Sequence, residues 1–332
     1  MALKSSRWLR VVGFLCMVII LSFLGRELWG NWIALQAYSW KVNPSLALFS
    51  FASLTGSLFC LPWGLREVLA LLGFRLPYWR VSKILFTSLM AKYLPGGWWA
   101  FVGKAFFYRQ EGLSLSQASV AVLIETLQVV TSAIFLFSLL FSLSSSVVWG
   151  VPKFFFVILG ALCLASIHPL FFNVFLRLAE KILKKSLISF DYPFRKIAYP
   201  FLIFFLFWVG MGTSFWVLAR SILGIEISLL PRMASAFALS WILGFLTFIT
   251  PGGLGVREGS LTLLLQPDIP LYAAAALALL SRIWWVGGEI LALILSVLWV
   301  RLSRREHRAC LKTGGTDLGV PPMPKEKRNY ST

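Results

Sequence analysis

Four ionisable side chains lie deep inside apolar stretches of the sequence: Glu125, Glu258, Arg282 and Glu289. Placing an ionised residue at the centre of a membrane helix costs on the order of 2.5–3.5 kcal/mol on insertion scales, so such residues normally face one another or a water-filled cavity. Arg282 and Glu289 are seven residues apart, which places them on one face of a helix. The four positions therefore indicate either structural ion pairs or a charged internal site.

Two Pro-Gly-Gly interruptions, at 95–97 and 251–253, divide long apolar segments. A helix that restarts after such a break presents unpaired N–H groups and the positive end of its dipole, which together favour an anion such as phosphate. Lys104 follows the first break and Arg257 follows the second. Lys92 also lies beside the first break, where it could instead reach the aqueous interface. The breaks predict an anion site.

The sequence contains no motif for nucleotide hydrolysis, for metal-dependent catalysis or for a serine nucleophile. It contains no GxxxxGK[S/T] nucleotide loop, no HExxH, no GxSxG and no cluster of carboxylates for a divalent metal. The two histidines and four cysteines do not have the spacing of metal ligands. We therefore expect no cofactor and no metal, and a transporter rather than an enzyme. Any transport would be downhill, coupled to an ion, or driven by a partner.

The composition is that of a membrane protein. Of the 332 residues, 58% are hydrophobic and 13% charged, and the mean hydropathy is +0.81. A soluble domain has about a quarter charged residues, so this chain has too little polar surface to coat a water-soluble core. The pI of about 10.2 does not indicate a nucleic-acid partner, because membrane proteins accumulate Lys and Arg on cytoplasmic loops.

Hydropathy predicts an all-α polytopic membrane protein with about six full crossings and two re-entrant hairpins of broken helices. The hairpins are predicted at Val81–Tyr108 and Ala234–Leu265, because Pro and Gly break a helix and neither half of a hairpin has the roughly 20 residues of a crossing. Two ordinary kinked spans remain the alternative for each. The crossings are predicted near 11–24, 45–63, 116–141, 151–171, 198–218 and 271–300.

Basic residues predict the orientation. With both termini cytoplasmic, the inside segments hold 21 Lys and Arg and the outside segments five. This bias is the one that membrane proteins show.

The two broken segments also resemble each other. A shift of 156 residues aligns both Pro-Gly-Gly breaks, with eight identities between 95–123 and 251–279. Because one hairpin enters from inside and the other from outside, the halves around 81–141 and 234–300 are predicted to be inverted repeats. Such repeats, with paired broken helices, indicate a transport site near the bilayer midplane.

Together these patterns predict a site that binds an anionic lipid headgroup. The residues predicted to bind it are Lys104, Arg257, Arg282, Gly96, Gly97, Gly252 and Gly253. The residues predicted to balance the charge or carry protons are Glu125, Glu258 and Glu289.

The stretch PGGLGVREG, Pro251–Gly259, resembles the transmembrane flippase-like domain of lysylphosphatidylglycerol synthases. KYLPGG, Lys92–Gly97, followed by Gly103-Lys104 and Glu125, resembles the first motif of that family, and the resemblance covers residues 5–305. The family usually has Arg in place of Lys104. It also has Glu-Arg-x-x-Asp where this chain reads Glu-Thr-Leu-Gln from Glu125. These departures concern the substrate and not the fold.

The resemblance implies a transmembrane domain over 1–305, followed by a basic disordered cytoplasmic tail, 306–332. In full synthases a soluble aminoacyltransferase domain makes the lipid and the membrane unit translocates it, and we expect this chain to be a stand-alone member. The resemblance to stand-alone members of the family implies that this chain moves or handles phospholipids, polyprenyl-linked lipids or hopanoid lipids.

Three functions stay open. The favoured one is a flippase or scramblase of the bacterial inner membrane that moves an anionic, aminoacylated or polyprenyl- or hopanoid-type lipid. The second is a membrane accessory subunit of a lipid- or glycan-modifying enzyme, and the third is an intramembrane transferase acting on a lipid. The expected partners are membrane lipids and either a lipid-synthesising enzyme or a second copy of the chain.

Overall fold

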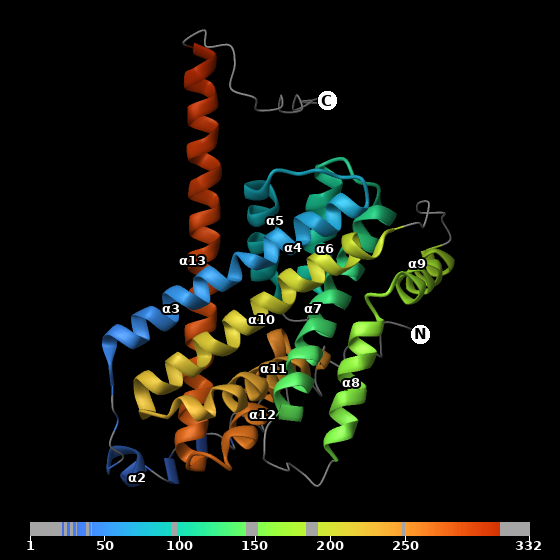
Figure 1. Ribbon diagram of the computed structural model, residues 1–332. Helices are drawn as coiled ribbons and strands as arrows, with labels where there is room; N and C mark the ends of the chain where they lie inside the picture. Colours follow the sequence, from blue (N-terminus) through green and yellow to red (C-terminus); the bar gives the residue numbers. More distant parts are fainter. Residues whose placement is uncertain are drawn as a thin grey trace, which may run out of the picture.

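The computed structural model describes residues 42–93, 98–143, 152–183, 192–247 and 250–312, with a few positions before residue 42. Every element in these ranges is helical (Figure 1). In chain order they are α2 (Trp32–Ala37), α3 (Pro44–Leu58), α4 (Cys60–Leu71), α5 (Tyr78–Met90), η1 (Ala91–Tyr93), α6 (Trp99–Gln110), α7 (Leu115–Leu143), α8 (Lys153–Ala165), α9 (Pro169–Leu183), α10 (Phe194–Leu223), η2 (Ile227–Leu229), α11 (Leu230–Leu246), η3 (Pro251–Gly253), α12 (Val256–Leu265) and α13 (Leu271–Lys312).

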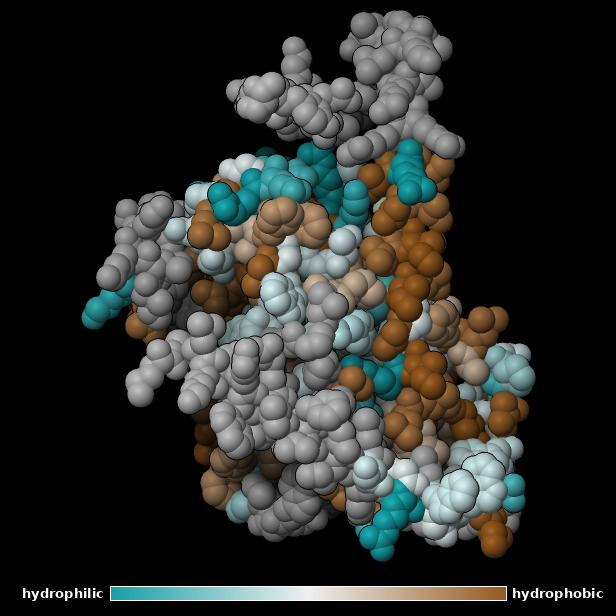
Figure 2. All heavy atoms as spheres, turned by 180° about the vertical axis from the view of Figure 1, so that it is seen from behind, coloured by the Kyte–Doolittle hydropathy of each residue, from teal (hydrophilic) through white to brown (hydrophobic). Residues whose placement is uncertain are grey.

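Five stretches of the described chain are long and apolar enough to cross a membrane: Pro44–Leu71, Leu115–Leu143, Phe194–Leu223, Ile227–Leu246 and Leu271–Ser303. Large apolar side chains also cover the outside of the molecule, and Figure 2 shows them along α13. Exposed apolar surface of this extent is unusual on a soluble protein but normal against lipid. The fold is the predicted all-α polytopic membrane fold.

Helices α3 and α4 pack antiparallel along α10, which is the most buried part of the core. The Asn43 N–H donates to the Ser221 carbonyl at 2.7 Å, and the Ser50 hydroxyl donates to the Ser214 carbonyl at 2.7 Å. At the other end, a Cβ on Gly64 would lie 2.5 Å from the Phe204 ring. Small residues and interhelical hydrogen bonds allow close helix packing in a membrane. These contacts fix the end of α4 beside the start of α10.

The first broken segment forms a hairpin of α5 and α6. Near its tip Gly103 lies against Ser88, and at its open end Arg80 Nη1 pairs with Glu111 Oε2 at 3.0 Å. The two helices therefore run antiparallel, as predicted for Val81–Tyr108.

The second broken segment forms a hairpin of α11 and α12. Gly244 lies against Arg257 near the tip, and Arg232 Nε pairs with Asp268 Oδ2 at 2.6 Å at the open end. The helices that follow the two hairpins, α7 and α13, run in opposite directions in Figure 1. The hairpins therefore open toward opposite ends of the molecule.

One predicted crossing is not straight. In the predicted span 151–171, α8 ends at Ala165 and α9 begins at Pro169, and the two helices are bent by 67°. The reason is local, because Pro169 has no N–H to donate and disfavours helical geometry at the residue before it, His168.

Two other boundaries differ from the prediction. Ile227–Leu246, half of the second hairpin, is long enough to cross a membrane, so the prediction that both halves are short is wrong for α11. Helix α13 continues to Lys312, so the first part of the predicted tail, 306–312, is helical. The rest of that tail, 313–332, and nearly all of the predicted span 11–24 lie outside the described residues.

The opposed hairpins can be tested by labelling at Gln110 and Gln266, which are aligned in the predicted repeat and exposed at the open ends. We expect Gln110→Cys to react with an impermeant maleimide from the cytoplasm only and Gln266→Cys from the outside only, in a chain whose native cysteines are replaced by serine. Labelling of both variants from one side would contradict the inversion.

Candidate functional site

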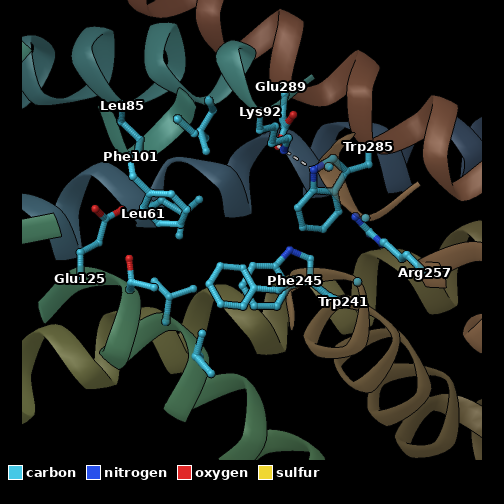
Figure 3. A pocket seen from close by; sticks show the side chains of 18 of the residues that line it. Leu61, Leu85, Lys92, Phe101, Glu125, Trp241, Phe245, Arg257, Trp285 and Glu289 are labelled. Atoms are coloured by element: carbon cyan, nitrogen blue, oxygen red, sulfur yellow. Dashed lines mark hydrogen bonds and ion pairs between the residues drawn. The ribbon is translucent and has the colours of Figure 1, made fainter. Parts of the chain in front are cut away.

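A cavity of about 170 Å³ lies between the two hairpins. It is lined by α5, η1 and α6 of the first hairpin, by α11, η3 and α12 of the second, and by α7 and α13 (Figure 3). Phe101, Trp241, Phe245 and Trp285 line the cavity between Glu125 and Arg257, which lie on opposite sides of it in Figure 3. The charged residues that line it are Lys92, Lys104, Glu125, Arg257, Arg282 and Glu289.

The tip of the second hairpin has a backbone that only glycine accommodates readily. Gly252 and Gly253 have φ of 58° and 72°, in the left-handed region. A Cβ on Gly253 would lie 2.8 Å from the Gly244 carbonyl oxygen, and one on Gly252 would lie 2.8 Å from Arg282 Nη2. The two glycines therefore let α11, η3 and an arginine side chain of α13 approach one another. Gly96 and Gly97, their predicted counterparts, lie outside the described residues.

The start of α12 is not open to an anion in the way that the sequence suggests. The Gly255 N–H donates to Glu258 Oε2 at 2.7 Å, so a carboxylate of the same helix occupies part of its N-terminus. This is the reciprocal half of a capping box, which favours an acidic residue at the third helical position. The cationic side chains, more than the helix dipole, therefore provide the positive charge at the cavity.

Arg257 is 5% exposed and has no carboxylate within ion-pair distance among the described residues. Its guanidinium carbon lies 4.3 Å from the centre of the Trp285 ring and 5.0 Å from that of Phe237. Nη2 is buried and makes no hydrogen bond within the described part of the chain. Aromatic faces stabilise a cation, but they do not accept its N–H groups. Arg257 thus faces the cavity with an unused donor.

Arg282 is partnered only loosely. Its Nη1 lies 3.7 Å from Glu258 Oε1, which is beyond hydrogen-bond distance, and its Nη2 has no acceptor among the described residues. The Tyr93 ring lies 5.6 Å from the guanidinium carbon. The pairing of Arg282 with Glu289 that their spacing suggests is not formed.

Glu289 instead joins the two halves of the molecule. It is 1% exposed and accepts hydrogen bonds from Lys92 Nζ, from the Tyr93 hydroxyl at 2.7 Å and from Trp285 Nε1 at 2.6 Å. Lys92 and Tyr93 come from the first hairpin, whereas Trp285 is one turn before Glu289 on α13. Tyr93 and Trp285 are not among the predicted site residues. Trp284 and Trp285 adjoin the predicted cavity in the sequence, which favours a role in packing for them, although the four-residue spacing between Trp285 and Glu289 would have indicated a contact.

Lys104 and Glu125 form a closed pair at the other end of the cavity. The Lys104 ammonium donates to both carboxylate oxygens of Glu125, at 2.8 and 2.9 Å, and both residues are buried. The charge of Lys104, a predicted headgroup ligand, is therefore already neutralised.

The charges around the cavity do not cancel. Four basic side chains meet three carboxylates: Lys92, Lys104, Arg257 and Arg282 against Glu125, Glu258 and Glu289. If all are ionised, one positive charge remains, and the pairing leaves it at Arg257. An uncompensated charge in a low-dielectric interior is costly, so the arrangement favours an anion. No group of three metal-binding side chains occurs in the described ranges.

The fold and the cavity define a polytopic membrane protein with an internal charged site between broken helices. Residues 8–287 match the family described as the lysylphosphatidylglycerol synthase TM region, and the chain belongs to that family. A search of the curated proteins found no match to the chain.

The closed pair generates a stability prediction. We expect Lys104→Ala to lower the free energy of unfolding by about 3–5 kcal/mol, because it leaves the Glu125 carboxylate buried and unpaired. The double variant Lys104→Ala/Glu125→Ala should recover most of this loss in detergent melting experiments. Equal melting temperatures for the single and double variants would contradict a coupled pair.

The hairpin tip generates a second stability prediction. Gly253→Ala should lower the melting temperature, because it combines a left-handed φ with a backbone clash and costs at least about 1 kcal/mol. Gly56→Ala is the matched control, since Gly56 is a helical glycine with no atom within 4 Å of the added Cβ. Equal melting temperatures for Gly253→Ala and Gly56→Ala would show that Gly253 does not need its left-handed φ or its close contact with Gly244.

Proposed function

We propose that the protein translocates a membrane lipid with an anionic phosphate headgroup, and that the phosphate binds in the cavity between the two hairpins. The family matched is consistent with a lipid-related role in the membrane. The observation that carries the proposal is Arg257, a buried guanidinium without a carboxylate partner among the described residues that lines the cavity.

Two arginines would hold the phosphate. Arg257 Nη2 and Arg282 Nη2 are both buried donors without an acceptor in the described chain, and both residues line the cavity. Arginine stays charged at membrane depth, and its planar fork matches phosphate oxygens. The loose 3.7 Å pair between Arg282 and Glu258 would be the contact that the headgroup replaces.

The size of the cavity limits what enters it. About 170 Å³ is less than the roughly 300–1,000 Å³ of ordinary ligand pockets, so it suits a headgroup rather than a whole lipid. The acyl chains would stay in the bilayer while the headgroup crosses through the broken helices. The sequence has no nucleotide-binding loop, so movement would be downhill, ion-coupled or driven by a partner. Glu125, Glu258 and Glu289 are the carboxylates available for proton coupling.

The test is a flipping assay with the purified chain in proteoliposomes. Phosphatidylglycerol and phosphatidylcholine, each with a fluorophore on an acyl chain, would be followed by chemical quenching of the outer leaflet. We expect faster exchange of phosphatidylglycerol. Arg257→Gln should slow it about 10- to 100-fold, the range for losing a hydrogen bond to a charged group, and Arg257→Lys should lie between.

Arg220→Gln provides the matched control, because Arg220 is exposed and lies far along α10 outside the cavity lining. The melting temperature of Arg257→Gln should stay close to that of the unaltered protein, since no carboxylate loses an ion-pair partner. An Arg257→Gln protein that melts early and regains exchange when Glu258→Gln is added would make Arg257 a structural residue.

A further inference from the structure

A second groove lies away from the central cavity, where α4 ends and α10 begins. It encloses about 1020 Å³ and is lined from α4, α7, α8 and α10. Its charged lining residues are four basic and one acidic: Arg66, Arg75, Arg195, Lys196 and Glu67. None of the central charged residues belongs to it.

The antiparallel packing of α3 and α4 on α10 brings the basic residues together. Because Asn43 meets Ser221 and Gly64 meets Phe204, the continuation of α4 reaches the first turn of α10. That turn carries Arg195 and Lys196 and contains no acidic residue, and the helix has no side-chain cap. The positive end of a 30-residue helix therefore adds to the side-chain charges. Both segments belong to the predicted cytoplasmic side.

The wall of the groove is apolar. Phe135 of α7 packs against Phe201 and Phe205 of α10, with ring centres 6.1 and 5.4 Å apart. Leu202 and Leu164, which also line it, are 50% and 44% exposed. The basic cluster and the exposed apolar wall thus lie side by side along α10.

We propose that this groove is a binding site for an anionic phospholipid of the cytoplasmic leaflet, separate from the central cavity. The headgroup phosphate lies among Arg66, Arg195 and Lys196, and an acyl chain lies along Leu202 and Phe205. Basic pockets between membrane helices on the cytoplasmic side bind anionic lipid headgroups, and this groove adds an apolar wall beside its basic cluster. A free phosphate ion would satisfy the charges and leave the apolar wall uncovered, so a lipid complements the whole surface.

The experiment maps bound lipid in the full chain. The protein is reconstituted in phosphatidylcholine vesicles that contain a small, equal fraction of diazirine-acyl phosphatidylglycerol or diazirine-acyl phosphatidylcholine, and is then irradiated. Mass spectrometry locates the adducts. We expect at least tenfold more labelling of residues 198–205 with phosphatidylglycerol, undiminished by excess glycerol phosphate in solution.

Arg195→Gln/Lys196→Gln should weaken this labelling about 25-fold, from about a fivefold effect for each basic residue. The matched control is Lys83→Gln/Arg109→Gln, two exposed basic residues outside the groove, which should leave labelling unchanged. Arg66→Gln provides an independent third variant. Arg257→Gln should also leave groove labelling unchanged. Failure of the flipping assay would therefore not contradict the groove proposal.

Four results would overturn the proposal. Equal labelling by phosphatidylcholine, or labelling that survives the loss of Arg195 and Lys196, would remove the role of charge. Competition by glycerol phosphate would make the site one for a soluble anion. Loss of groove labelling in Arg257→Gln would make the groove a path to the central cavity and not a separate site.

Discussion

Buried charge in an apolar surrounding is the constraint on which this structure depends. Seven ionisable side chains meet around one cavity inside a molecule whose outer surface is largely apolar: Lys92, Lys104, Glu125, Arg257, Glu258, Arg282 and Glu289. Each would be costly alone at membrane depth, so the helices that carry them must stay together. Glu289, with donors from both η1 and α13, links the first hairpin to the last helix. The charges that hold the bundle together also define the site.

Each hairpin contributes one member of a buried ion pair with the helix that follows it, and the cation and the carboxylate exchange places between the two hairpins. In the first half the hairpin supplies the cation and the following helix the carboxylate, as Lys104 and Glu125. In the second half the hairpin supplies the carboxylate and the following helix the cation, as Glu258 and Arg282. The first pair is closed by two hydrogen bonds, whereas the second is 3.7 Å apart and shares Glu258 with the backbone of Gly255. The second half is therefore where positive charge stays available.

Much of the architecture could be predicted because it follows from local composition. Long apolar runs specify membrane helices, and Pro-Gly-Gly specifies breaks. The crossings predicted near 45–63, 116–141, 198–218 and 271–300 and both hairpins therefore follow from composition. The match over residues 8–287 confirms the family that the motif around Arg257 resembles. The predicted fourth crossing, 151–171, is bent by 67° between α8 and α9, a feature that hydropathy does not register because it averages over the break at Pro169. The extent of α11 was also misjudged, since its helix begins before the apolar run.

The sequence by itself determined which residues carry charge into the membrane, and it placed Arg257, Arg282 and the glycines of the second break at the site. Only the tertiary structure decided how the charges pair. Spacing along a helix allowed Arg282 to meet Glu289, but Lys92 and Tyr93, nearly two hundred residues away, take that carboxylate instead. Pairing in three dimensions depends on which helices pack together, and an ion pair across a cavity leaves no periodic signal in the chain. The unpaired state of Arg257 follows from that packing alone.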